Sequence, residues 1–129
     1  DTTKNYKVYV EAYKMAGKKK ASLAKSITVH IAGKDSKKYT NVKTVQINKT
    51  SFTLKKGGSV KIQPKAVLYN KWKKQLSANH TKQFRFKSSN PNVATVSSAG
   101  KIKAKGTGEC IIYIYARNGC KRKIKVKVK

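Results

Sequence analysis

Short runs in which apolar and polar residues alternate recur along most of the chain. In the clearest of them, Ile124, Val126 and Val128 alternate with lysines between residues 121 and 129. Alternation with a period of two is typical of a β-strand that has one buried and one solvent-exposed face. The segment 101–105 repeats this pattern. No segment of convincing length shows the period of an amphipathic helix, so the sequence predicts an all-β fold.

The predicted strands are short and are separated by glycine, asparagine, proline and serine, as in all-β sandwiches and barrels. An N-terminal hairpin is expected from residues 6–13 and 23–31, with a loop at 14–20. The polar, basic segment 34–41 is predicted to be a linker. Further strands are expected at residues 42–47, 52–54, 59–68, 84–87, 93–96, 101–103, 109–116 and 121–128, with a long polar connection at 70–82.

The chain is strongly basic, with 32 Lys and Arg residues, 4 Asp and Glu residues, and a formal net charge of +28. Much of this charge occupies the polar positions of predicted strands and would decorate the outside of a sheet. Only Arg85, Arg117 and Arg122 are arginines. Lysine supplies diffuse attraction to anions, whereas sequence-reading nucleic-acid binders favour arginine. We therefore expect a lysine-coated domain that associates with anionic polymers, and the composition argues against a dedicated nucleic-acid site.

Three blocks of residues carry a resemblance to a known family. They are segment 45–62 with its Gly-Gly pair, segment 86–97 with Ser-Ser-Asn-Pro-Asn, and segment 100–112 with Gly-Lys-Ile-Lys-Ala-Lys-Gly-Thr-Gly. In this order they resemble a bacterial immunoglobulin-like group 2 domain over residues 42–129. The resemblance implies an immunoglobulin-like sandwich of two sheets, found in tandem on bacterial surface and secreted proteins, where such domains act as spacers and adhesion modules.

Residues 1–33 lie outside this resemblance and are predicted to form an extra N-terminal β-hairpin. Segments 2–10 and 26–30 are similar to the last two strands of a fibronectin type III domain. This similarity implies that the chain is an excerpt from a longer multidomain protein. Two strands alone are only marginally stable in water. The hairpin is therefore expected to pack on the main domain, to pair with another chain, or to stay mobile.

Residue types that support catalysis, metal binding or membrane insertion are scarce. The carboxylates form neither the pair that a glycosidase needs nor the cluster that binds calcium. His30 and His80 have no second ligand at metal-binding spacing, and no base marks a nucleophilic Ser, Thr or Lys. No apolar run approaches the roughly 20 residues of a membrane helix. We therefore expect a non-catalytic domain without a cofactor, a metal or a membrane-inserted segment. The four carboxylates are Asp1, Glu11, Asp35 and Glu109.

The two cysteines fall in the last two predicted strands. Alternation places Cys110 on the core face, and the Asn118-Gly119 pair favours a two-residue type I′ turn that would set Cys110 opposite Lys127. The cysteines would then lie roughly 23 Å apart along the ladder. A disulfide needs Cα atoms within about 7 Å. We therefore predict a buried, inert thiol at Cys110 and an exposed one at Cys120, whose basic neighbours could make it reactive.

Aromatic side chains are the remaining candidates for ligand contacts. Tyr113 and Tyr115 fall on the predicted outer face of their strand, and Trp72 lies in the long polar connection between Lys71 and Lys73. A tryptophan flanked by lysines can stack on a sugar or a base while the amines hold an anion. It can also fold over an open end of the sandwich as a lid on the core, which is the interpretation that we favour.

The sequence thus predicts a non-catalytic, extracellular structural and adhesion module of a bacterial surface or secreted protein. Its expected partners are anionic cell-wall or extracellular polymers and neighbouring domains of a longer chain. An alternative is a specific carbohydrate- or host-protein-binding adhesin site around Trp72 and the face of Tyr113 and Tyr115. A nucleic-acid binder is a further alternative that the low arginine content disfavours. The extracellular location rests on the family resemblance, because the sequence shows no targeting segment.

Overall fold

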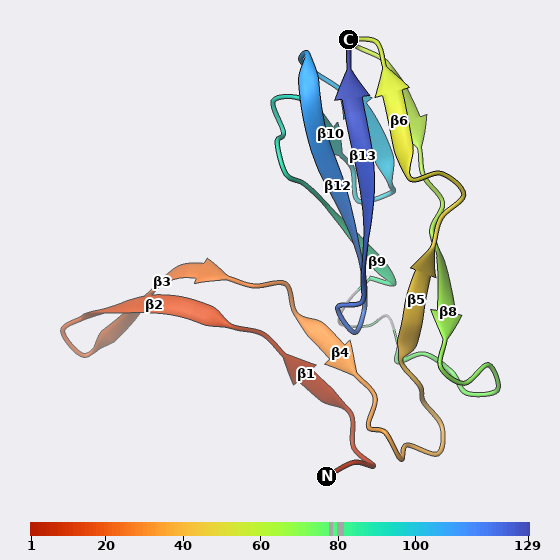
Figure 1. The fold of residues 1–129 in the computed structure, drawn as a ribbon. Coiled ribbons are helices and arrows are strands. Elements are labelled where there is room, and N and C mark those ends of the chain that lie inside the picture. Colours follow the sequence, from red (N-terminus) through yellow and green to blue (C-terminus); the bar gives the residue numbers. More distant parts are fainter. Residues whose placement is uncertain (78, 80–81) are drawn as a thin grey trace.

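The structure is a computed structural model that describes residues 1–77, 79 and 82–129. The described residues form strands joined by turns and loops (Figure 1). They contain no helix long and apolar enough to cross a membrane. The strands are β1 (Tyr6–Val8), β2 (Glu11–Ala16), β3 (Lys19–Lys25), β4 (Val29–Ile31), β5 (Val42–Gln46), β6 (Ser51–Leu54), β7 (Ser59–Lys61), β8 (Lys65–Leu68), β9 (Phe84–Ser88), β10 (Ala94–Val96), β11 (Lys101–Ala104), β12 (Gly108–Ala116) and β13 (Lys121–Val128).

A four-stranded sheet with the order β6-β13-β12-β9 forms one layer of the body. The C-terminal strand β13 lies in its interior, antiparallel to β12 and parallel to β6. From Cys110 in β12 and from Ile124 in β13, every second residue is buried, as the sequence predicts, whereas Arg122 near the start of β13 is exposed. The sheet therefore has one apolar face and one face covered by polar and aromatic side chains.

The opposite side of the body is built from a three-stranded sheet, β10-β11-β7, and a two-stranded sheet, β5-β8. The single strand predicted at 59–68 is therefore wrong, because it is divided into β7 and β8, which belong to different sheets. Pro64 lies between the two strands. Proline has no N–H to donate to a ladder, so a break at this position lets the chain pass from one sheet to the other.

One hydrophobic core lies between these sheets. Its largest fully buried side chains come from β5, β11, β12 and β13, and partly buried aromatic residues of β6 and β9 pack at its margin. The all-β, immunoglobulin-like sandwich predicted from the sequence is confirmed. The largest fully buried side chains are Val45, Ile102, Ile112, Ile114, Ile124, Val126 and Val128.

The loop between β12 and β13 differs from the predicted turn. Tyr115 pairs with Lys121, and the N–H of Ala116 donates to the carbonyl of Cys120 at 2.8 Å, which leaves a three-residue loop. A type I′ turn requires positive φ at both central residues. Among the described residues only glycines have positive φ, and Gly119 is the one in this loop, at 83°. The predicted two-residue turn is therefore wrong.

The longer loop shifts the register of the β12–β13 pair by one residue. Cys110 lies opposite Val126 rather than Lys127, and Ile112 lies opposite Ile124. The physical reason is burial, because residues directly opposite each other project from the same face of a sheet. At these two pairs the observed register joins apolar side chains to each other, whereas the predicted one would place a lysine in the core.

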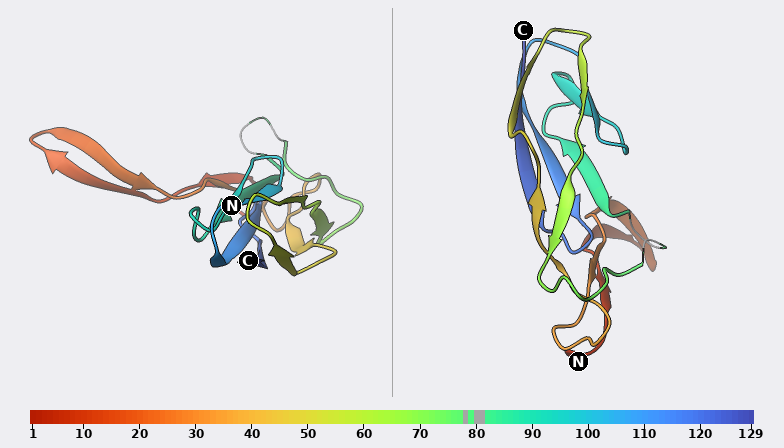
Figure 2. Two further views of the ribbon diagram at one scale, coloured as in Figure 1. Left: turned by 90° about the horizontal axis from the view of Figure 1, so that it is seen from above. Right: turned by 90° about the vertical axis from the view of Figure 1, so that its right-hand side faces the viewer.

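Residues 6–31 form a long two-stranded ribbon that extends away from the sandwich (Figures 1 and 2). β1 pairs with β4 at its base, and β2 pairs with β3 in its outer part. The outer pair continues to Ala16 and Lys19, so only Gly17 and Lys18 form the loop, and the predicted loop at 14–20 is too long. Gly17 has a φ of 64°, a conformation that glycine adopts without steric cost and that permits a tight turn.

The base of the ribbon contacts the body at the loop between β12 and β13. The N–H of His30 donates to the carbonyl of Arg117 at 2.7 Å, and the guanidinium of Arg85 donates to the carbonyl of Thr28. A Cβ placed on Gly119 would lie 3.0 Å from a methyl group of Val29. Residues 1–33 were expected to pack on the main domain, to pair with another chain, or to stay mobile. The base of the ribbon packs on the main domain.

Candidate binding face

The outer face of the four-stranded sheet arranges tyrosines and basic residues in rows. On β12, Tyr113 lies between Lys123 of β13 and Lys87 of β9. One row away, Tyr115 lies between Lys121 of β13 and Arg85 of β9. Cross-strand neighbours have Cβ atoms roughly 5 Å apart. Each tyrosine is therefore flanked by basic side chains on both sides.

The two tyrosines contact each other along the strand. Their ring centroids are 6.2 Å apart, and the ring planes differ by 28°. The ammonium groups of Lys121 and Lys123 each lie 5.9 Å from the centroid of Tyr113, within the range of a cation–π interaction. The two half-buried rings thus pack together beside the ammonium groups of β13.

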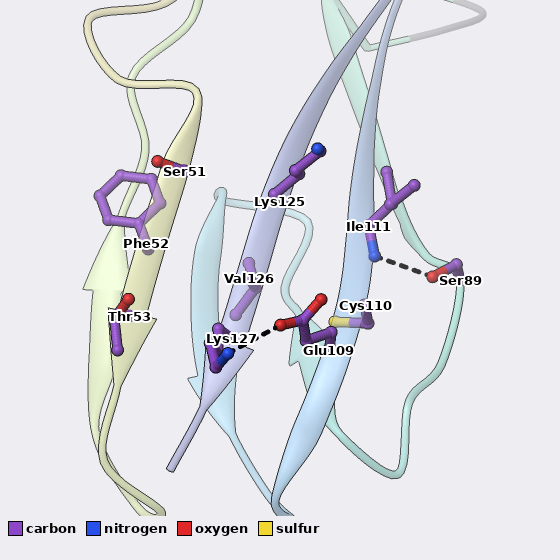
Figure 3. A pocket seen from close by; sticks show the side chains of 10 residues that line it. All are labelled: Ser51, Phe52, Thr53, Ser89, Glu109, Cys110, Ile111, Lys125, Val126 and Lys127. Atoms are coloured by element: carbon purple, nitrogen blue, oxygen red, sulfur yellow. Dashed lines mark hydrogen bonds and ion pairs between the residues drawn. The ribbon is translucent and has the colours of Figure 1, made fainter.

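Two further rows continue the face toward the C-terminal end of β13 (Figure 3). Ile111 is paired with Lys125 and Glu109 with Lys127, and the last two side chains form an ion pair at 3.1 Å. A groove of about 540 Å³ lies here, with Ser51 and its neighbours on β6 along one side. The groove is lined by apolar side chains, among them Phe52 and Ile111, together with hydroxyl, ammonium and carboxylate groups.

Two arginines near this face hold the backbone together. The guanidinium of Arg85 contacts the carbonyl of Thr28 and, at 3.5 Å, the carbonyl of Ala116. That of Arg117 donates to the carbonyl of Leu76. Burial lowers the pKa of both guanidinium groups. These residues attach the ribbon and the loop after β8 to the body and are less available to a ligand than the lysines.

Trp72 is 85% exposed, so the interpretation of this side chain as a lid on the core is wrong. Trp72 lies in a turn after β8, where its backbone N–H donates to the side-chain oxygen of Asn70 at 2.9 Å. This turn directs the indole outward. The ammonium of Lys71 lies 4.9 Å from its ring centroid, whereas that of Lys73 donates to the carbonyl of Ser36 at 2.6 Å. Lys71 thus remains beside the indole, and Lys73 holds the segment 34–41.

The two cysteines are free thiols in different environments. Cys110 is buried in the core, and this burial raises the pKa of its thiol. Cys120 is half-buried rather than exposed, because it packs against the core at the hairpin end, with its sulfur 3.6 Å from the carbonyl of Lys43. The prediction of an exposed thiol at Cys120 is therefore wrong, although basic residues lie beside it in the sequence.

Within the described part of the chain, no three His, Cys, Asp or Glu side chains gather as metal ligands would. His30 is buried at the base of the ribbon. His80, the other histidine considered as a metal ligand, lies outside the described residues.

The structure brings Tyr113 and Tyr115 together with the lysines of β13, but Trp72 belongs to the turn after β8, which is part of another sheet. The rows of tyrosine and lysine were missed in the sequence because the predicted register would have set Tyr113 opposite Ile124. Correct pairing of the buried residues of β12 and β13 would have found them, since it also determines which exposed residues lie side by side.

Comparison with protein families matches residues 41–126 to the bacterial Ig-like domain (group 2). No curated protein sequence matches the chain. Among solved structures, domains 4 and 5 of the S-layer protein SbsC are similar, with a TM-score of 0.56 and 17% identity over 79% of this chain and 58% of that one.

Two longer SbsC structures are also similar. Domains 1–6 give a TM-score of 0.56 over 79% of this chain, and rSbsC(31-844) gives 0.57 over 80%, both at 17% identity. In each case the match covers 14% of the SbsC chain. This chain thus spans only a part of the S-layer proteins that it resembles in fold.

Proposed function

This chain belongs to the bacterial immunoglobulin-like group 2 family, and we propose that it is a non-catalytic structural module of a bacterial surface or secreted protein. Its partners would be neighbouring domains of a longer chain and anionic cell-wall or extracellular polymers. The S-layer proteins that resemble it in fold contain several domains in one chain, which supports a place among such modules.

The observation that carries the polymer-binding part is the distribution of charge on the four-stranded sheet. The outward positions of β13 are all lysines, and of the four Asp and Glu side chains in the chain only Glu109 lies on this sheet. A surface of one sign attracts a polyanion over about a Debye length, roughly 10 Å at 0.1 M salt. Such attraction is weak and is lost as the salt concentration rises.

A salt-titrated binding panel tests this proposal. Purified anionic cell-wall polymer, heparin, DNA and a neutral glycan are compared from low salt to roughly half-molar sodium chloride. We expect the polyanions to bind at low salt and to be released as salt rises, and the neutral glycan not to bind. Absence of binding to every polyanion at low salt would contradict the proposal.

The exposure of Trp72 favours a second candidate function, specific adhesion to a carbohydrate or a host protein. An indole that is 85% exposed, with Lys71 beside its ring and Tyr69 also exposed nearby in sequence, offers a flat surface for a sugar. Trp72 is the only tryptophan of the chain, so its fluorescence reports on this one position.

In this second case, a ligand should change the Trp72 emission and remain bound at half-molar salt. Trp72→Ala should abolish that salt-resistant binding, while Tyr13→Ala on the ribbon, far from this turn in sequence, serves as a control for the loss of an exposed aromatic residue. If no ligand in a panel of neutral and acidic glycans changes the emission, the adhesin function at this turn is excluded for those glycans.

A further inference from the structure

We propose that the outer face of β12 and β13 binds a linear, hydroxyl-rich polyanion in an extended form. The polymer would lie along the strands with about one negative charge every 6–7 Å. This inference rests on the proposed association with anionic polymers and adds the position, orientation and ligand chemistry.

The spacing of the lysines on β13 determines the spacing of negative charges that a bound polymer should have. Lys121, Lys123, Lys125 and Lys127 project from one face of one strand at every second residue. Alternate residues of a strand are about 6.7 Å apart, so the four ammonium groups span roughly 20 Å. An extended polymer with the same repeat can place one anion beside each lysine. Double-stranded DNA carries a charge about every 1.7 Å and does not match this spacing.

The availability of the lysines differs along this row. Lys127 is already paired with Glu109 at 3.1 Å, which neutralises the end of the row. Lys121 and Lys123 lie near the ring of Tyr113 at 5.9 Å, and Lys125 is paired with the apolar Ile111. Three consecutive ammonium groups therefore have no carboxylate opposite them on β12.

The two tyrosines are the reason to expect hydroxyl groups on the bound polymer. Tyr113 and Tyr115 stack against each other and present hydroxyl groups beside the lysine row. Phenolic hydroxyls donate and accept hydrogen bonds, which suits the hydroxyls of a polyol or sugar unit between two charges. A nucleic-acid base would need an open ring face, and the ring of Tyr113 has Tyr115 stacked against it and two lysine ammonium groups nearby. The geometry thus favours a polyol or sugar polymer over single-stranded nucleic acid.

The test compares two doubly substituted proteins that lose the same charge. Lys123→Gln with Lys125→Gln removes two neighbours of the row on β13. Lys101→Gln with Lys103→Gln removes two exposed lysines with the same spacing on β11, which belongs to the three-stranded sheet. The probes are poly(glycerol phosphate), polygalacturonate and oligothymidylate, measured at low ionic strength. The melting temperature of each variant verifies that the fold is intact.

We expect the β13 variant to weaken binding of a hydroxyl-rich polymer about fivefold, from roughly 0.5 kcal/mol for each exposed ion pair, and the β11 variant to leave it unchanged. The tighter of poly(glycerol phosphate) and polygalacturonate identifies the anionic group. Equal weakening by both variants would overturn the inference but leave the proposed function standing. Binding of no polyanion to the unmodified chain would instead refute the proposed function.

Removal of the tyrosine hydroxyls separates the two polymer classes. Tyr113→Phe with Tyr115→Phe keeps the rings and the charge, and it should weaken binding of the hydroxyl-rich polymer but not of oligothymidylate. If oligothymidylate binds most tightly and the hydroxyls have no effect on any probe, the face is a nucleic-acid site and the inference is wrong.

Discussion

At the scale of single residues, neighbours on β12 occupy opposite environments. Ile112 has no exposed surface, whereas the adjacent Ile111 lies half-exposed on the outer face. The same side chain thus contributes very differently to stability at two consecutive positions, because a strand directs successive side chains to opposite faces.

We predict that Ile112→Ala lowers the free energy of unfolding by about 3 kcal/mol, since it removes buried methyl groups and leaves a cavity. The matched Ile111→Ala should cost less than about 1 kcal/mol. Denaturant unfolding of both variants measures the difference. Similar losses at the two positions would contradict the assignment of the buried face.

Cys110 and Cys120 should differ in reactivity. With Cys120→Ser as the background, Cys110 should be alkylated at pH 8 only as fast as the domain opens. With Cys110→Ser as the background, the half-buried Cys120 should react much faster. Mass spectrometry after iodoacetamide treatment compares the two rates. Equal rates under native conditions would show that Cys110 is not enclosed.

Because the pKa of Cys110 is raised, the free energy of unfolding should depend on pH. The folded protein holds this thiol protonated at a pH where the unfolded chain already ionises it. Its contribution to stability is therefore complete below the ordinary thiol pKa and is lost as the pH rises toward the folded-state pKa. The difference in unfolding free energy between the unmodified protein and Cys110→Ala should accordingly be smaller at pH 10 than at pH 7. A constant difference would contradict this prediction.

At the scale of elements, the ribbon and the sandwich obey different constraints. The sandwich strands place one face in a shared core, but the outer ribbon pair β2–β3 leaves Tyr13, Met15 and Leu23 about half or more exposed. Alternation in the ribbon sequence predicts strands correctly, yet it does not identify a buried face. The pairing of β2 with β3 is thus held by backbone hydrogen bonds and cross-strand contacts such as that of Lys20 with Tyr13 at 4.1 Å.

We therefore expect Met15→Ser combined with Leu23→Ser to change the melting temperature by no more than about 4 °C, because each exposed substitution usually costs within ±0.5 kcal/mol. Calorimetry compares the melting temperature of this variant with that of Ile112→Ala. A large loss of stability in the ribbon variant would mean that its outer part packs on the body in solution.

At the scale of the whole molecule, the net charge of +28 opposes the compact state. The described residues contain three ion pairs, and two of these are in the N-terminal ribbon and its flank. Repulsion between exposed lysines is long-ranged in dilute buffer and is screened by salt.

The melting temperature should consequently rise by a few degrees between roughly 10 mM and 300 mM sodium chloride. The same change in osmolarity made with sucrose provides a control for effects that are not electrostatic. A melting temperature that is constant or falls with sodium chloride would show that charge repulsion is not a significant part of the stability.

The sequence alone determined the features that depend on local pattern. Alternation identified the strands of the C-terminal half and the buried positions of β12 and β13, because the period of two is a property of one strand. Three motif blocks identified the family, since their turns depend on glycine, serine, asparagine and proline at particular positions. The scarcity of carboxylates and the lysine-rich surface also followed from composition.

Only the tertiary structure decided the features that depend on two segments at once. The register of β12 and β13 follows from the joining of two buried faces, and it created the rows of Tyr113 and Tyr115 with lysines. The division of residues 59–68 between two sheets and the outward position of Trp72 likewise depend on which surfaces the core leaves open. A local pattern shows that a residue favours a strand or a turn, but burial against distant segments decides what it contacts.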